Sequence, residues 1–144
     1  MKKNIIFKSL FVFSLLIIFA ACSEDDSNPS NPQTPETAGT YQGTNSLDTT
    51  MTITVSGISG KAFVTSYSIN YKSNSGGTSI KGNVGESDSD GLAEVVNNSF
   101  EISLGAEADE KLTGTISSST MTGNFKIPSG AFSSAITGTY SISK

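Results

Sequence analysis

The residues best suited to chemistry are four acidic side chains in one short stretch of the chain. Asp88 and Asp90 stand at alternate positions before a glycine, as in the first half of a calcium-binding loop. Glu94 and Glu101 follow, and a tight turn midway between them would place them directly opposite each other across two strands. Since like charges opposed across strands are destabilising, a shared Ca²⁺ would relieve the repulsion. The sequence therefore offers Asp88, Asp90, Glu94 and Glu101 as calcium ligands, with a solvated acidic turn as the alternative.

The composition argues against enzymatic chemistry. The chain has 144 residues, no His, no Trp and no Arg, and its single Cys is Cys22. Without imidazole there is no Ser-His-Asp triad and no ordinary zinc site. The pair Glu94 and Glu101 would lie on an exposed strand face, outside the kind of cleft in which general acid–base catalysis works. We expect a protein that is not an enzyme and has no cofactor, with that calcium as the alternative.

The N-terminus has the features of an export signal. Two lysines precede an apolar stretch from Leu10 to Ala21, which is shorter than the ~20 residues of a membrane-spanning helix. The segment Phe19-Ala20-Ala21-Cys22 resembles the lipobox of bacterial lipoproteins, in which the Cys is acylated and becomes the mature N-terminus. The resemblance implies that residues 1–21 are a lipoprotein signal peptide and that Cys22 carries acyl chains such as palmitate. The alternative is an ordinary secretory signal.

The residues after Cys22 bear on where the anchored protein lies. Ser23-Glu24-Asp25-Asp26 resembles the acidic surface-export signals of some Gram-negative lipoproteins. This implies an outer-membrane protein facing the cell exterior, with the periplasmic face as the alternative. Removal of the leader leaves six lysines against thirteen acidic residues, a formal charge of −7. Such a surface repels anionic lipid and nucleic acid, so the acyl chains are the expected membrane contact and nucleic acid is not an expected partner.

Residues 22–38 are expected to form a tether that carries the acylated Cys. The stretch is acidic, contains three of the chain's four prolines and has no large apolar side chain after the Cys. The folded part is therefore expected over residues 39–144, as a single domain.

From Gly39 onward, apolar residues alternate with polar ones. A period of two is the mark of half-buried antiparallel strands, and no window has the period of a capped amphipathic helix. The clearest runs are 51–55, 63–71, 100–104, 112–116, 121–127 and 136–142.

Glycines predict the register of the last strands. A tight turn between the fourth and fifth of these runs sets Gly114 against Gly123, and the next hairpin sets Gly123 against Tyr140. The same hairpin sets Phe125 against Gly138. Large rings opposite glycines let a sheet coil tightly while each ring covers the gap.

Of two earlier turns, one predicts a strand register and the other leaves the register open. A turn at Asn97-Asn98, where both residue types tolerate positive φ, would set Glu94 against Glu101. The turn around Gly57–Gly60 leaves the register open, because a two-residue and a three-residue loop put different faces of residues 63–71 inward.

Eight or nine consecutive antiparallel strands suit an up-and-down barrel. The segments Gly39-Thr40-Tyr41-Gln42-Gly43-Thr44 and Ile136-Thr137-Gly138-Thr139-Tyr140-Ser141-Ile142 resemble the flanking strands of calycin-like barrels, the broad group that holds lipocalins and avidins. The resemblance implies an all-β fold, an antiparallel up-and-down meander that closes into an eight-stranded barrel. A β-sandwich is the alternative.

A barrel of this kind suggests two functions. The first is a non-catalytic binding module whose interior takes a small apolar or amphipathic ligand. The second is a structural or adhesion-type surface protein whose barrel is filled by its own side chains. The residues expected to line a ligand are Phe63, Tyr67, Ile69, Tyr71, Phe100 and Tyr140.

Overall fold

The structure is a computed structural model that describes residues 35–75, 78–129 and 134–144. The predicted signal peptide and Cys22 lie outside these ranges. None of the described residues forms a helix of the length and apolarity that crossing a membrane requires. The described chain forms nine strands: β1 (Gly39–Thr44), β2 (Thr50–Ile58), β3 (Lys61–Ser75), β4 (Thr78–Ser87), β5 (Ala93–Glu94), β6 (Ser99–Ser103), β7 (Lys111–Ser117), β8 (Thr120–Ile127) and β9 (Ile136–Ser143).

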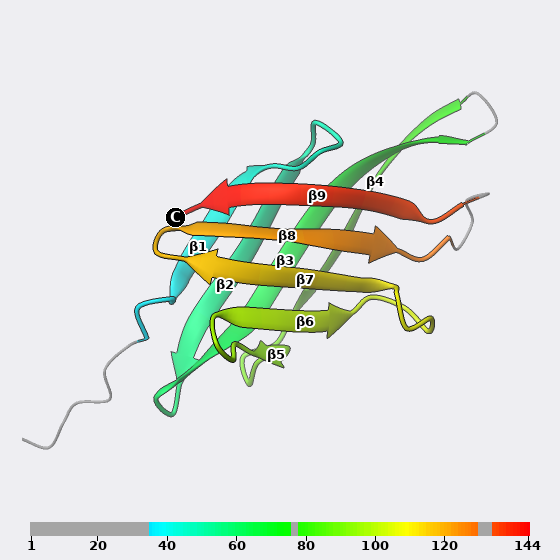
Figure 1. Ribbon diagram of the computed structural model, residues 1–144. Coiled ribbons are helices and arrows are strands. Elements are labelled where there is room, and N and C mark those ends of the chain that lie inside the picture. The colour runs from blue at the N-terminus through cyan, green and yellow to red at the C-terminus, as the bar shows by residue number, and fades with distance from the viewer. Residues whose placement is uncertain (1–34, 76–77, 130–133) are drawn as a thin grey trace, which may run out of the picture. The chain divides into compact units, whose positions relative to one another are not determined.

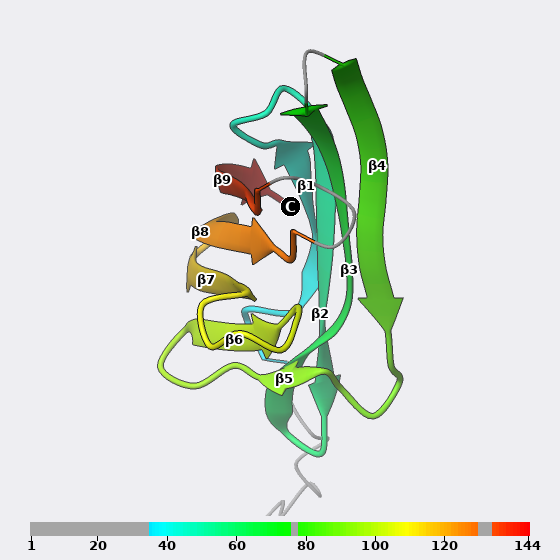
Figure 2. The ribbon, with the colours of Figure 1, turned by 90° about the vertical axis from the view of Figure 1, so that its right-hand side faces the viewer.

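All nine strands belong to one antiparallel sheet. Neighbours follow the order β4-β3-β2-β1-β9-β8-β7-β6, and the short β5 pairs with β3. The sheet curls so strongly that β6–β9 cross in front of β1–β4 (Figure 1). From the side, the two groups of strands form facing layers (Figure 2). The predicted antiparallel meander is confirmed as an open barrel, since pairing of β1 with β9 joins the two layers that a sandwich would keep as separate sheets.

The core fills the space between the two layers. Eighteen buried apolar side chains form one contiguous cluster. Because alternate residues of a strand point to opposite faces, each strand contributes every second residue to this cluster and presents the others to solvent. The largest fully buried side chains are Tyr41, Met51, Ile53, Val64, Ile69, Leu112 and Met121.

The predicted register of β7, β8 and β9 is confirmed. Gly114 pairs with Gly123, Gly123 with Tyr140, and Phe125 with Gly138. The glycines are needed where they stand, because the rings occupy the space that a side chain would take. A Cβ on Gly138 would lie 2.3 Å from Cζ of Phe125.

A β-bulge divides the long strand β3. Thr54 pairs with Ser66, but the next residue of β2, Val55, pairs with Val64. Thr65 is therefore the extra residue, and the bulge strengthens the local bend of the sheet.

The bulge decides which side chains of β3 face the core. Val64 faces the core before the bulge, and Tyr67 and Ile69 face it afterwards. The continuous alternation predicted for residues 63–71 is therefore wrong. Phe63 lies on the outer face, where its ring covers Gly91.

The turn at Asn97-Asn98 forms as predicted. Both residues have positive φ, 50° and 62°, and the turn closes an isolated bridge between Val96 and Ser99. Beyond this bridge the two strands separate instead of continuing as a hairpin: β5 pairs with β3 and β6 pairs with β7. The turn thus lies at the corner where the sheet passes from one layer to the other.

The separation of β5 from β6 has a structural cause. β4 ends at Ser87, and β3 extends past that point with a free edge. β5 takes this edge: the amide of Leu92 donates to the carbonyl of Val64 at 2.7 Å, and the amide of Val95 donates to the carbonyl of Ala62 at 2.8 Å. Backbone groups at an exposed edge are satisfied in this way by the same chain.

The last residues of the predicted tether contact the end of the barrel. The hydroxyl of Tyr41 donates to the carbonyl of Thr37 at 2.8 Å. The ammonium of Lys144 donates to the carbonyls of Glu36 and Ala38 at 2.6 and 3.0 Å. It also lies 5.4 Å from the centre of the Tyr41 ring, a cation–π distance. The segment from Pro35 therefore already belongs to the folded part.

Candidate functional site

The four predicted calcium ligands do not converge. Glu94 pairs with Lys61 at 3.0 Å, and Glu101 pairs with Lys111 at 2.9 Å. The predicted opposition of Glu94 and Glu101 is wrong, because their strands bond to different neighbours. Each carboxylate thus has a lysine that offsets its charge without a metal.

The two aspartates serve a local turn. An oxygen of Asp88 accepts a hydrogen bond from the amide of Asp90 at 2.9 Å, and both side chains are exposed. Across the described residues, no group of three or more His, Cys, Asp or Glu side chains has an arrangement that could hold a metal ion. The geometry fits the solvated acidic turn.

The predicted ligand-lining residues fall into two groups. Tyr67, Ile69, Phe100 and Tyr140 are buried in the core cluster, and Tyr71 packs against that cluster. These five lie in or against the core cluster. The sixth, Phe63, does not, because the bulge in β3 turns it to the outer face.

Two rings fill the interior beside the glycine pair of β7 and β8. A Cβ on Gly114 would lie 2.4 Å from Cε1 of Phe100, and a Cβ on Gly123 would lie 2.7 Å from the hydroxyl of Tyr140. That hydroxyl donates to the carbonyl of Thr113 at 2.8 Å, across the intervening strand. Burial raises the pKa of Tyr140, which keeps the phenol neutral in the folded protein. The rings close this part of the interior.

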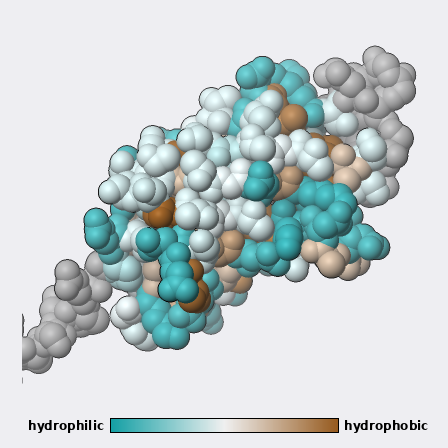
Figure 3. Space-filling view, in the orientation of Figure 1, coloured by the Kyte–Doolittle hydropathy of each residue, from teal (hydrophilic) through white to brown (hydrophobic). Residues whose placement is uncertain are grey.

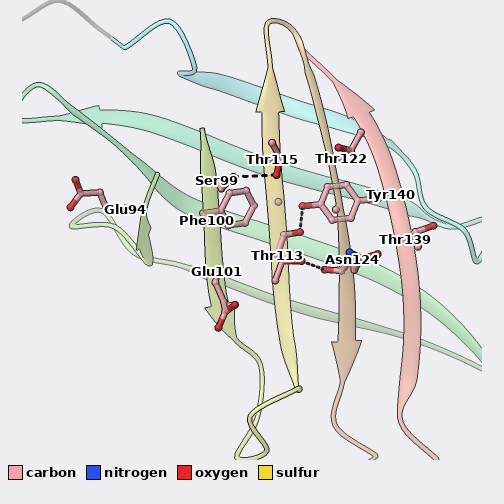
Figure 4. A pocket seen from close by; sticks show the side chains of 12 residues that line it. Glu94, Ser99, Phe100, Glu101, Thr113, Thr115, Thr122, Asn124, Thr139 and Tyr140 are labelled. Carbon is pink, nitrogen blue, oxygen red and sulfur yellow. Dashed lines mark hydrogen bonds between the residues drawn. The ribbon is translucent and has the colours of Figure 1, made fainter. Parts of the chain in front are cut away.

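A groove of about 810 Å³ runs over the outer face of β6–β9 (Figure 4). It passes over Gly114 and Gly123, with the edges of Phe100 and Tyr140 at its floor. Its walls are hydroxyl and amide side chains that alternate with core residues along each strand. These are Ser99, Thr113, Thr115, Thr122, Asn124 and Thr139.

The groove side chains form two rows across four strands. The strand pairings align Ser99, Thr115, Thr122 and Ser141 in one row. They align Glu101, Thr113, Asn124 and Thr139 in the next. Neighbouring strands lie ~4.8 Å apart, so each row presents polar groups at that spacing.

Two acidic side chains line the groove, and each is paired with a lysine: Glu94 with Lys61 and Glu101 with Lys111. Outside this lining, Lys126 pairs with Asp109. The hydrogen bond from Lys126 lowers the pKa of the Asp109 carboxyl. Between these pairs the face is neutral, and Figure 3 shows it as mostly pale over β7–β9, with the strongly hydrophilic side chains mainly toward the rim.

From the sequence alone, these hydroxyl side chains are expected only as the solvent-facing residues of half-buried strands. The signal that would have found the groove is the repeated Thr-x-Thr spacing beside glycines, as in Thr113-Gly114-Thr115. Alternation shows that such residues face outward but not that their rows align. Comparisons with protein-family models, curated proteins and solved structures find no match. The candidate site therefore rests on the geometry of this chain alone.

Proposed function

We propose that the mature protein is a non-catalytic binding or adhesion module, held at the outer membrane by acyl chains on Cys22 and facing the cell exterior. Of the two functions considered from the sequence, the geometry supports the filled barrel better than the carrier of an internal apolar ligand. Its contacts with other molecules are then made by the outer surface.

The packing of the interior carries this proposal. Four of the six residues expected to line a ligand are instead core residues, with exposed fractions of 0% for Ile69 and at most 6% for Tyr67, Phe100 and Tyr140. Ring atoms occupy the positions beside Gly114, Gly123 and Gly138 that an empty barrel would leave open. Since interiors pack with few voids, little room is left for a second molecule.

The anchoring part of the proposal is tested with a Cys22→Ser variant. The thiol is the acylation site implied by the lipobox, so the variant is expected to lose its acyl chains and to be either unprocessed or soluble. The readouts are cell fractionation and intact mass. Ser23→Ala, which alters the next residue and keeps the thiol, is expected to remain acylated and membrane-bound.

The opposite result is equally specific. If the unaltered protein has no acyl mass on Cys22 and Cys22→Ser stays as membrane-bound as the parent, lipid anchoring is overturned. Protease added to whole cells then reports the side of the membrane: cleavage supports the exterior, and protection supports the periplasmic face.

A further inference from the structure

We infer that the groove on the outer face of β6–β9 binds a neutral polyhydroxylated chain, that is, a glycan of uncharged sugars. The inference rests on the proposed function, in which the outer surface of an exported barrel makes the contacts. It names the chemical class of the partner and the residues that recognise it.

The hydrogen-bonding groups of the groove are available. Hydroxyl and amide side chains both donate and accept, which matches the hydroxyl groups of a sugar. Ser99 bonds to Thr115 at 3.2 Å, but the side chains of Thr122, Asn124 and Thr139 have no hydrogen-bond partner within the described parts of the chain. These three lie on neighbouring strands β8 and β9 and line the groove (Figure 4).

The floor and walls of the groove differ in polarity. Gly114 and Gly123 lie at the floor beside the rings of Phe100 and Tyr140, which are 6% and 5% exposed, and threonines make the walls. A sugar ring has the matching division, with C–H groups on its faces and hydroxyl groups around its rim. A ligand lying flat in the groove would meet apolar surface below and polar groups at both sides.

The charges in and around the groove favour an uncharged partner. The acidic side chains that line the groove, Glu94 and Glu101, are each paired with a lysine, at 3.0 and 2.9 Å. The mature chain's formal charge of −7 opposes an acidic polysaccharide. An apolar partner is disfavoured as well, because the one large apolar side chain that is well exposed within the described residues, Val96, is not in the groove.

The groove is also held in a fixed shape. Its polar groups lie on paired strands rather than on loops, and four of the six are threonines, whose branched Cβ restricts χ1. Binding would therefore order few side chains, which lowers the entropic cost of association.

The test is affinity electrophoresis of the full-length lipoprotein, solubilised in detergent, in native gels that contain dextran, laminarin or yeast mannan. Alginate serves as the acidic control. Retardation by at least one neutral polysaccharide and none by alginate is expected. No retardation by any neutral polysaccharide, or retardation by alginate alone, overturns the inference.

Matched triple variants locate the site. Thr113→Val/Thr122→Val/Thr139→Val removes three groove hydroxyls and keeps branched, strand-favouring side chains. It is expected to weaken binding at least tenfold. The control Thr40→Val/Thr52→Val/Thr54→Val makes the same change on the outer face of β1 and β2 and is expected to bind like the parent. Equal binding by parent and groove variant overturns the assignment.

A single substitution keeps the inference testable if the triple variant does not fold. Asn124→Ala changes one exposed side chain and is expected to weaken binding several-fold with an unchanged melting temperature. Unchanged binding by Asn124→Ala, together with unchanged binding by whichever triple variant folds, overturns the inference. Since the gels use purified protein, a negative result is independent of whether Cys22 anchors the chain in cells.

Discussion

Gly123→Ala is expected to lower the free energy of unfolding by ~3 kcal/mol, the upper part of the range for overpacked cores. The added methyl would lie 1.9 Å from the backbone oxygen of Thr113 and 2.7 Å from the hydroxyl of Tyr140. That oxygen cannot move aside easily, because it belongs to a paired strand and accepts the Tyr140 hydroxyl. Chemical denaturation of the parent and the variant gives the difference.

Gly43→Ala is the matched control for this prediction. Its added methyl would lie 2.9 Å from Cγ2 of Ile142, a longer distance and to a side-chain methyl rather than to backbone, so a smaller loss of ~1 kcal/mol is expected. The two substitutions add the same atom to two strands of one sheet. A loss for Gly123→Ala no greater than that for Gly43→Ala would contradict the packing described beside Tyr140.

Alkaline pH is expected to destabilise the barrel steeply through Tyr140. Burial raises the pKa of this phenol above its ordinary value of 10, whereas in the unfolded chain the phenol titrates near 10. Above pH 10 the unfolded chain therefore loses a proton that the folded protein retains. The stability that is fully present below pH 10 is lost as pH rises toward the folded-state pKa. Melting temperatures measured between pH 8 and pH 12 should fall accordingly.

Tyr140→Phe is expected to remove most of this pH dependence. The variant also loses the hydrogen bond to Thr113, so its stability at neutral pH should be lower by ~1 kcal/mol. Burial and the nearby Glu86 also raise the pKa of Tyr67, but less than burial raises that of Tyr140, so Tyr67→Phe should change the alkaline slope less. If Tyr140→Phe shows the same alkaline decline as the parent, another group carries it.

Alternation and glycine placement were sufficient to predict most of the fold. The three C-terminal strands have apolar residues at strict period two and glycines opposite large rings, so only one register closes the core without overlap. β4 was absent from the predicted runs because its sequence, TSIKGNVGES, has few large apolar residues to mark a buried face.

The features that were missed depend on tertiary pairing. A one-residue bulge at Thr65 reverses the inward face of β3, and alternation cannot place a bulge, because both faces there contain apolar residues. The acidic pair Glu94 and Glu101 looked like neighbours because a local turn was extended into a full hairpin. In the structure β5 pairs instead with the free edge of β3, which is distant in sequence. The hydroxyl rows are likewise visible only once four strands are aligned.

The central claim, a barrel filled by its own side chains, is tested most directly by titration with a fluorescent long-chain fatty acid. The measurement uses purified protein in buffer without detergent, because detergent would compete for the probe. The packed interior predicts no saturable fluorescence change, because Phe100, Tyr140 and their neighbours already occupy the space. Saturable one-to-one binding that displaces these rings would contradict the account and favour the carrier of an internal apolar ligand.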